Sequence, residues 1–172
     1  MNKKALVIAV FLMAVAVLAT PVMAAPIKID VTGTTLITYT HVGKVWQADS
    51  NGLMREVEMT TIYTIHNYPG QDPLVGTGVS IGHSMLKFTK PPPDSNAWSN
   101  DHFKQVITFT GEGITGTFEG VGHRKALGFP VSTYEESDIL YHGTGDFEGQ
   151  TLKISSTGTP GSWEGVLLMP KS

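Results

Sequence analysis

The chain has 172 residues, with 12 Lys and Arg against 15 Asp and Glu, and it contains no cysteine. The absence of cysteine excludes a disulfide framework, a thiolate zinc site and a thiol nucleophile. A mildly acidic chain without a cluster of basic residues offers no electrostatic surface for nucleic acid or anionic lipid, so we expect neither partner.

The first 24 residues have the pattern of a secretory signal. Two lysines precede an apolar run over 5–19, and Val22-Met23-Ala24 offers a cleavage site. We expect a signal-peptide helix over 1–24, cleavage after Ala24 and export to the cell exterior. Removal of 24 of the 172 residues leaves one domain of 148 residues over 25–172. An uncleaved signal that anchors the chain in a membrane is the alternative.

The first half of the mature chain alternates apolar and polar residues, as half-buried strands do. Turn residues at Asn51-Gly52 and over 67–73 separate three expected strands, which cover 27–47, 55–66 and 75–89. If the apolar faces of the last two coincide, Ile81 lies opposite Met59 and His83 opposite Val57. Tyr63 and His83 are then predicted to face the core, and the glycines of 75–89 the other side.

The longest loop-like stretch is Lys90–Asp101, which contains three consecutive prolines and then Trp98. Consecutive prolines are stiff and extended, and they do not fit inside a sheet. We therefore expect Trp98 to lie near a mouth of the fold, either as a plug over the core or as part of a lid.

The second half of the chain is rich in glycine and repeats an aromatic-Glu-Gly phrase at Phe118, Phe147 and Trp163. A two-residue turn at Gly111-Glu112 predicts Phe103 opposite Gly120 and sends Glu119 to solvent. Aromatic rings over glycines indicate a tightly curved sheet. Strands are expected over 102–110, 114–122, 139–149, 151–156 and 162–169, with a second loop over 127–138.

About eight strands without an amphipathic helix in the mature chain favour an all-β fold. We expect a single antiparallel up-and-down barrel, with a β-sandwich as the alternative. An eight-stranded barrel has room for side chains or for one small ligand.

The segment Gly143-Thr144-Gly145-Asp146-Phe147-Glu148-Gly149 resembles the Gly-x-Gly-x-Phe segment near the end of the allene oxide cyclase and dirigent-type barrels. The resemblance covers about the last 60 residues. It implies a cavity for an apolar or phenolic molecule, with cyclase or coupling-guide chemistry, and it carries over no catalytic residue. The signal and the closing Trp163–Pro170 segment are also similar to small secreted archaeal and bacterial proteins of unknown role.

Motifs that carry chemistry are sparse. The 6 histidines are scattered, with no two within four positions, so we expect no metal site and no cofactor. The carboxylates of Glu56, Glu58 and Glu135-Glu136 are expected on exposed faces rather than as a catalytic pair. Nucleophile-elbow, Walker and dinucleotide motifs are absent. The candidate ligand-binding residues are Tyr63, His83 and Tyr141, predicted to face inward, and Trp98 near a mouth.

Three functions fit this pattern. The first is a secreted barrel that binds a small apolar or aromatic ligand in its interior. The second is a cyclase or isomerase that uses an inward Glu or His as acid or base. The third is an extracellular structural or interaction module with a solid core. The sequence leaves the ligand and the oligomeric state undecided.

Overall fold

The computed structural model describes residues 25–48, 51–88, 97–111, 113–127, 133–158 and 161–171. The predicted signal over 1–24 and most of the predicted loop over 90–101 lie outside the described residues. Within the described part of the chain, no helix is long and apolar enough to cross a membrane.

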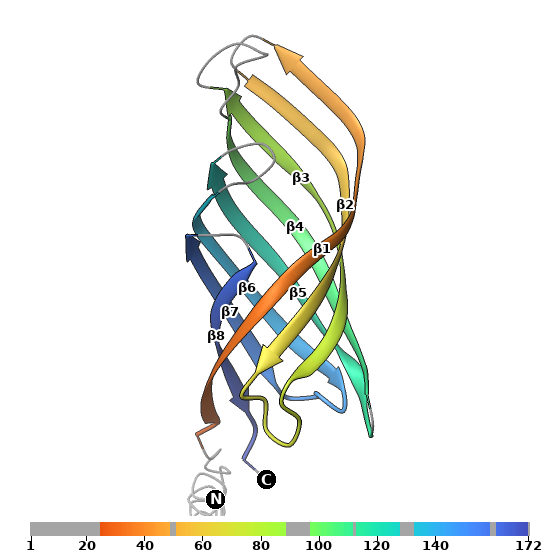
Figure 1. Ribbon diagram of the computed structural model, residues 1–172, viewed down its shortest axis with the longest axis vertical. Helices are drawn as coiled ribbons and strands as arrows, with labels where there is room; N and C mark the ends of the chain where they lie inside the picture. Colours follow the sequence, from red (N-terminus) through yellow and green to blue (C-terminus); the bar gives the residue numbers. More distant parts are fainter. Residues whose placement is uncertain are drawn as a thin grey trace, which may run out of the picture.

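Eight antiparallel strands form the fold, as predicted. Each strand pairs with the next in the chain, and β1 pairs with β8 as well, so one sheet closes into a ring, a closed barrel (Figure 1). The sandwich alternative, with two separate sheets, is therefore not what forms. The strands are β1 (Ile27–Ala48), β2 (Asn51–His66), β3 (Leu74–Phe88), β4 (Ala97–Gly111), β5 (Ile114–Leu127), β6 (Thr133–Gly145), β7 (Thr151–Gly158) and β8 (Ser162–Met169).

β1 begins and β8 ends at the same end of the ring (Figure 1). Buried aromatic side chains pack together there. Phe147, in the turn after β6, stacks on Phe118 with ring centres 4.9 Å apart and lies 5.4 Å from Phe109. The Tyr68 ring meets Phe147 edge-on at 5.9 Å, and its hydroxyl donates to Gln150 Oε1 over 3.1 Å. This end of the fold is therefore closed by packed side chains.

Glycines on neighbouring strands make room for these and other rings, as the alternation of glycines and aromatic residues predicted. A Cβ added at Gly76 would meet the ring of Phe109, and one added at Gly122 would meet the ring of Phe103. Larger residues at these positions would displace the rings from the core.

The predicted register of β2 and β3 is wrong by one residue. Met59 pairs with Ser80 and Val57 with Gly82, so the glycines of β3 face the interior and His83 faces solvent. The physical reason is volume, because the rings from β2 and β4 occupy the interior at this level and leave space only for Gly and Ser beside them. The predicted inward position of Tyr63 is correct, since only 6% of it is exposed.

The loop prediction for Trp98 is also wrong. β4 begins at Ala97, and Trp98 pairs with Lys87 on β3 and Leu127 on β5. Trp98 alternates with the buried Ser99, so its half-buried ring lies on the outer face, 5.4 Å from Lys125 Nζ. Because strands on both sides pair with this part of β4, its backbone N–H and C=O groups have hydrogen-bond partners. This pairing outweighs the preference for a loop that the preceding prolines indicate.

The hairpin of β4 and β5 is shifted by two residues from the prediction, so Phe103 lies opposite Gly122. A shift of two leaves the faces unchanged, and Glu119 is exposed as expected. β6 begins at Thr133, inside the segment predicted as a loop over 127–138, because its early residues pair with β5. The side chains of Glu135 and Glu136 lie outside the described residues.

Candidate functional site

Two of the four candidate residues meet inside the ring. Tyr63 on β2 donates its hydroxyl hydrogen to Gln105 Oε1 over 2.8 Å, and Tyr141 on β6 donates to the same oxygen. Gln105 is 4% exposed and Tyr141 is fully buried. Burial, and secondarily the neighbouring Tyr63, raises the pKa of Tyr141 well above its usual value, so this phenol stays neutral. Gln105 was not predicted as a site residue, because a lone Gln carries no sequence signal for a binding site.

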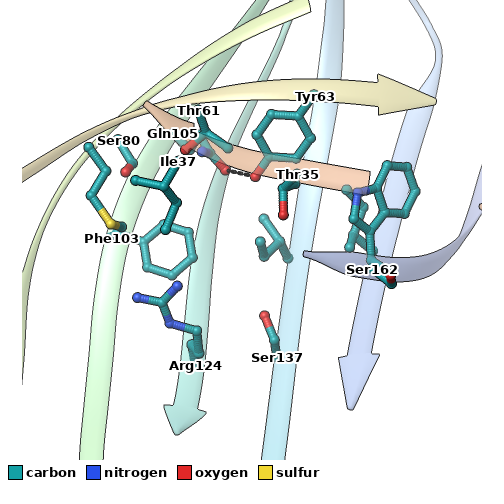
Figure 2. Close-up of a pocket in the computed structure, with 14 residues that line it drawn as sticks. Thr35, Ile37, Thr61, Tyr63, Ser80, Phe103, Gln105, Arg124, Ser137 and Ser162 are labelled. Carbon is teal, nitrogen blue, oxygen red and sulfur yellow. Dashed lines mark hydrogen bonds between the residues drawn. The ribbon is translucent and has the colours of Figure 1, made fainter. Parts of the chain in front are cut away.

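The cavity beside this group is small. Its volume is about 50 Å³, and Figure 2 shows Tyr63 and Gln105 on one side of it with Arg124 and Ser137 on the other. A space of this size holds a few water molecules. Pockets for drug-sized ligands have volumes of about 300–1,000 Å³. The interior cavity is therefore too small, as it stands, for the ligand expected from the sequence.

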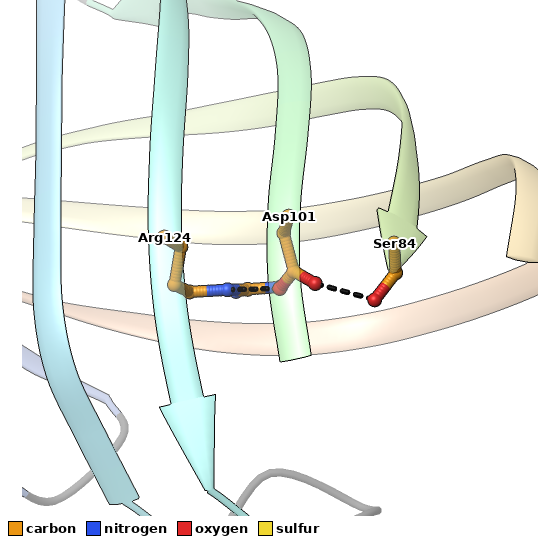
Figure 3. Close-up of polar contacts among 3 residues, drawn as sticks. All are labelled: Ser84, Asp101 and Arg124. Atoms are coloured by element: carbon orange, nitrogen blue, oxygen red, sulfur yellow. Dashed lines mark hydrogen bonds and ion pairs between the residues drawn. The ribbon is translucent and has the colours of Figure 1, made fainter. Parts of the chain in front are cut away.

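A buried ion pair lies next to the cavity (Figure 3). Arg124 on β5 donates from Nε and Nη2 to Asp101 Oδ2 over 2.7 and 2.6 Å. Ser84 on β3 donates to Asp101 Oδ1 over 2.6 Å. Both oxygens of the Asp101 carboxylate thus accept hydrogen bonds from protein donors. The side chains of Asp101 and Arg124 are only 9% and 13% exposed. This arrangement suits a structural pair better than an acid or base that must reach a substrate.

Three histidines line up on the outer face. His83 on β3 lies directly opposite His102 on β4, which lies opposite His123 on β5. The ring centres are 5.3 Å apart in the first pair and 4.6 Å in the second. Asp138 on β6 pairs with His123 and continues the row. We call His83, His102, His123 and Asp138 the histidine row.

A second row runs parallel to the first across the same strands. Its apolar members are Ile81, Val121 and Leu140, which are 55%, 62% and 46% exposed. Lys104 and Lys153 complete this apolar row through direct strand pairing. Between the two rows the side chains point inward, and the backbone of Gly82 and Gly122 contributes to a groove of about 650 Å³.

The four candidate residues therefore do not form one site. Tyr63 and Tyr141 come together inside, His83 lines the outer groove, and Trp98 lies on the outer face without lining that groove. The histidine row was missed because its members are about 20 residues apart in the chain. The two-residue error in the β4–β5 register placed His102 opposite Val121 instead of His123.

In the described part of the chain, no set of three or more His, Asp or Glu side chains is already arranged to hold a metal ion. No protein-family model matches the sequence, and comparisons with curated proteins and with solved structures gave no match.

Proposed function

We propose that this chain is an exported binding protein that holds a small aromatic or apolar molecule with a negative charge in the groove across the outer face of β3–β7. The observation that carries the proposal is the exposed apolar row over a groove of about 650 Å³, against an interior cavity of about 50 Å³. The groove has the volume of a small-molecule site. The signal pattern over 1–24 supports export.

The charges of the groove favour an anion on the ligand. Lys104 and Lys153 stand in the apolar row, while Asp138 is the single carboxylate among the described residues that line the groove. Asp138 accepts a hydrogen bond from Ser155 over 2.7 Å and lies 4.0 Å from Lys153 Nζ. An aromatic carboxylate or sulfonate can lay its ring on Val121 and Leu140 and direct its charge to a lysine.

The other two functions have less support. A cyclase or isomerase needs an inward acid or base, and the described carboxylate inside the ring, Asp101, is engaged by Arg124 and Ser84. A structural module with a solid core agrees with the packed interior. The groove nevertheless gives a reason to assign a small ligand, since the exposed side chains of Val121 and Leu140 lie on paired positions along it. Adjacent exposed apolar side chains on a groove are a feature of binding surfaces.

The direct test is fluorescence titration of the mature protein with 1-anilinonaphthalene-8-sulfonate, an aromatic sulfonate that brightens in apolar sites. Val121→Asp places a charge in the groove and is expected to weaken binding at least about tenfold, the effect of roughly 1.4 kcal/mol. Val121 is 62% exposed, so the fold should be unaffected.

The matched control is Val45→Asp on β1, a residue that is 68% exposed and does not line the groove. This variant is expected to bind the probe as the parent does. Equal loss in both variants, or no loss in Val121→Asp, would contradict the proposal.

A further inference from the structure

We propose that His102 and His123 form a two-imidazole binding site for a divalent transition-metal ion such as Cu²⁺. The two residues face each other on the adjacent antiparallel strands β4 and β5, and both are exposed on the outer face. The sheet fixes their backbones, so binding orders only two short side chains. Imidazole nitrogen is a preferred ligand of Cu²⁺, Ni²⁺ and Zn²⁺.

The separation of the rings fits a shared ion. A metal–nitrogen distance of about 2.0–2.1 Å places an ion roughly 3 Å from the centre of each ligating ring, so two rings on one ion have centres about 5 Å apart. The ring centres of His102 and His123 are 4.6 Å apart, and their planes are tilted by 51°. Rotation of the side chains alone can therefore turn one nitrogen of each ring toward a common point.

The neighbours of the pair define the kind of site. His83 lies beyond His102 with ring centres 5.3 Å apart, but these two rings are stacked with their planes 24° apart, so their nitrogens lie in nearly parallel planes. Asp138 pairs with His123 on the other side. The described side chains hold no ready-made set of three ligands, so water completes the coordination. An open site of two imidazoles suits a reversibly bound ion rather than a structural one that the fold needs.

Lysines oppose a cation only weakly here. Lys104 and Lys153 line the other wall of the groove and are exposed, so salt and water screen their charge. The site draws on the histidine row and not on the apolar row, so it does not depend on the small-molecule proposal.

The test is electron paramagnetic resonance of the mature, tag-free protein with one equivalent of Cu²⁺ at neutral pH, with affinity measured by calorimetry. We expect a copper signal with two nitrogen ligands, and at least a tenfold loss of affinity in both His102→Gln and His123→Gln. His142→Gln is the matched control, because His142 is exposed on the same face of β6 but pairs with Glu119.

Several results would overturn the assignment. Copper affinity equal to that of the parent in His102→Gln or in His123→Gln would place the copper elsewhere. An equal loss of affinity in His142→Gln would do the same, as would a loss in His83→Gln without one in His123→Gln. The copper measurements contain no sulfonate probe, and Val121→Asp is used only in the fluorescence titration, so the two proposals fail separately. Circular dichroism of each variant checks that the fold is retained.

Discussion

At the scale of single residues, the interior is organised by Gln105, whose side-chain oxygen accepts hydrogen bonds from both Tyr63 and Tyr141. Strand periodicity predicted that both tyrosines face inward, because residues two apart on a strand share a face. It did not predict the common acceptor, since that depends on which residues of three separate strands reach the same level. The histidine row was not predicted for the same reason, because it depends on the register of separate strands.

The raised pKa of Tyr141 makes stability depend on pH in the alkaline range. The folded state holds the neutral phenol, so its stabilisation is complete below the unfolded pKa of about 10 and is lost as pH rises toward the folded pKa. We expect the free energy of unfolding of the parent to fall more steeply above pH 10 than that of Tyr141→Phe, by up to about 1.4 kcal/mol per pH unit.

Urea denaturation at several pH values from 9 to 11 measures this difference. Tyr68, whose pKa burial also raises, is present in both proteins, so it does not affect the comparison. Parallel curves for parent and variant would show that Tyr141 ionises as easily in the folded state as in the unfolded one.

At the scale of elements, β3 shows why register was harder to predict than strand position. Its apolar residues alternate with Gly and Ser, and the usual assignment buries the apolar set. In the structure Val79 and Ile81 are exposed and Gly78 and Ser80 are buried, because neighbouring strands supply the interior volume. The buried face of β3 cannot be predicted from its own sequence, because it depends on the side chains that neighbouring strands place in the core.

Gly122→Ala tests this packing. The new methyl group would meet the ring of Phe103 and Cγ1 of Ile139, so we expect a loss of about 1–3 kcal/mol in the free energy of unfolding, measured with urea. The same change made in a Phe103→Leu background should cost less, because the smaller side chain leaves room. An equal loss of stability in both backgrounds would mean that the ring of Phe103 does not limit the space for a methyl group at position 122.

At the scale of the whole molecule, the ring is closed at one end by packed aromatic side chains and is nearly solid within. Phe147 and Phe118 are both fully buried there. The Gly-x-Gly-x-Phe segment places Phe147 in this packing through the turn between β6 and β7. The all-β class and eight strands were predictable from alternation and turn residues. The outer groove was not, because it depends on the register of five strands together.

Phe147→Ala is expected to destabilise the molecule by about 3–5 kcal/mol, because it opens a cavity among rings that close the end of the fold. This is a large part of the 5–15 kcal/mol that stabilises a typical domain. Urea denaturation with Val121→Ala as an exposed control, expected within about 0.5 kcal/mol of the parent, makes the comparison. A loss below about 1 kcal/mol for Phe147→Ala would show that this end is not part of the cooperative core.

The proposed ligand site is the outer groove and not the inside of the ring. Amide chemical shifts of the ¹⁵N-labelled mature protein, followed during titration with 1-anilinonaphthalene-8-sulfonate, test it most directly. We expect the largest shifts at Gly82, Val121 and Gly122, with the side-chain amide of Gln105 unmoved. Shifts centred on Gln105 and Tyr141, with the groove residues unchanged, would contradict the claim and place the ligand in the interior.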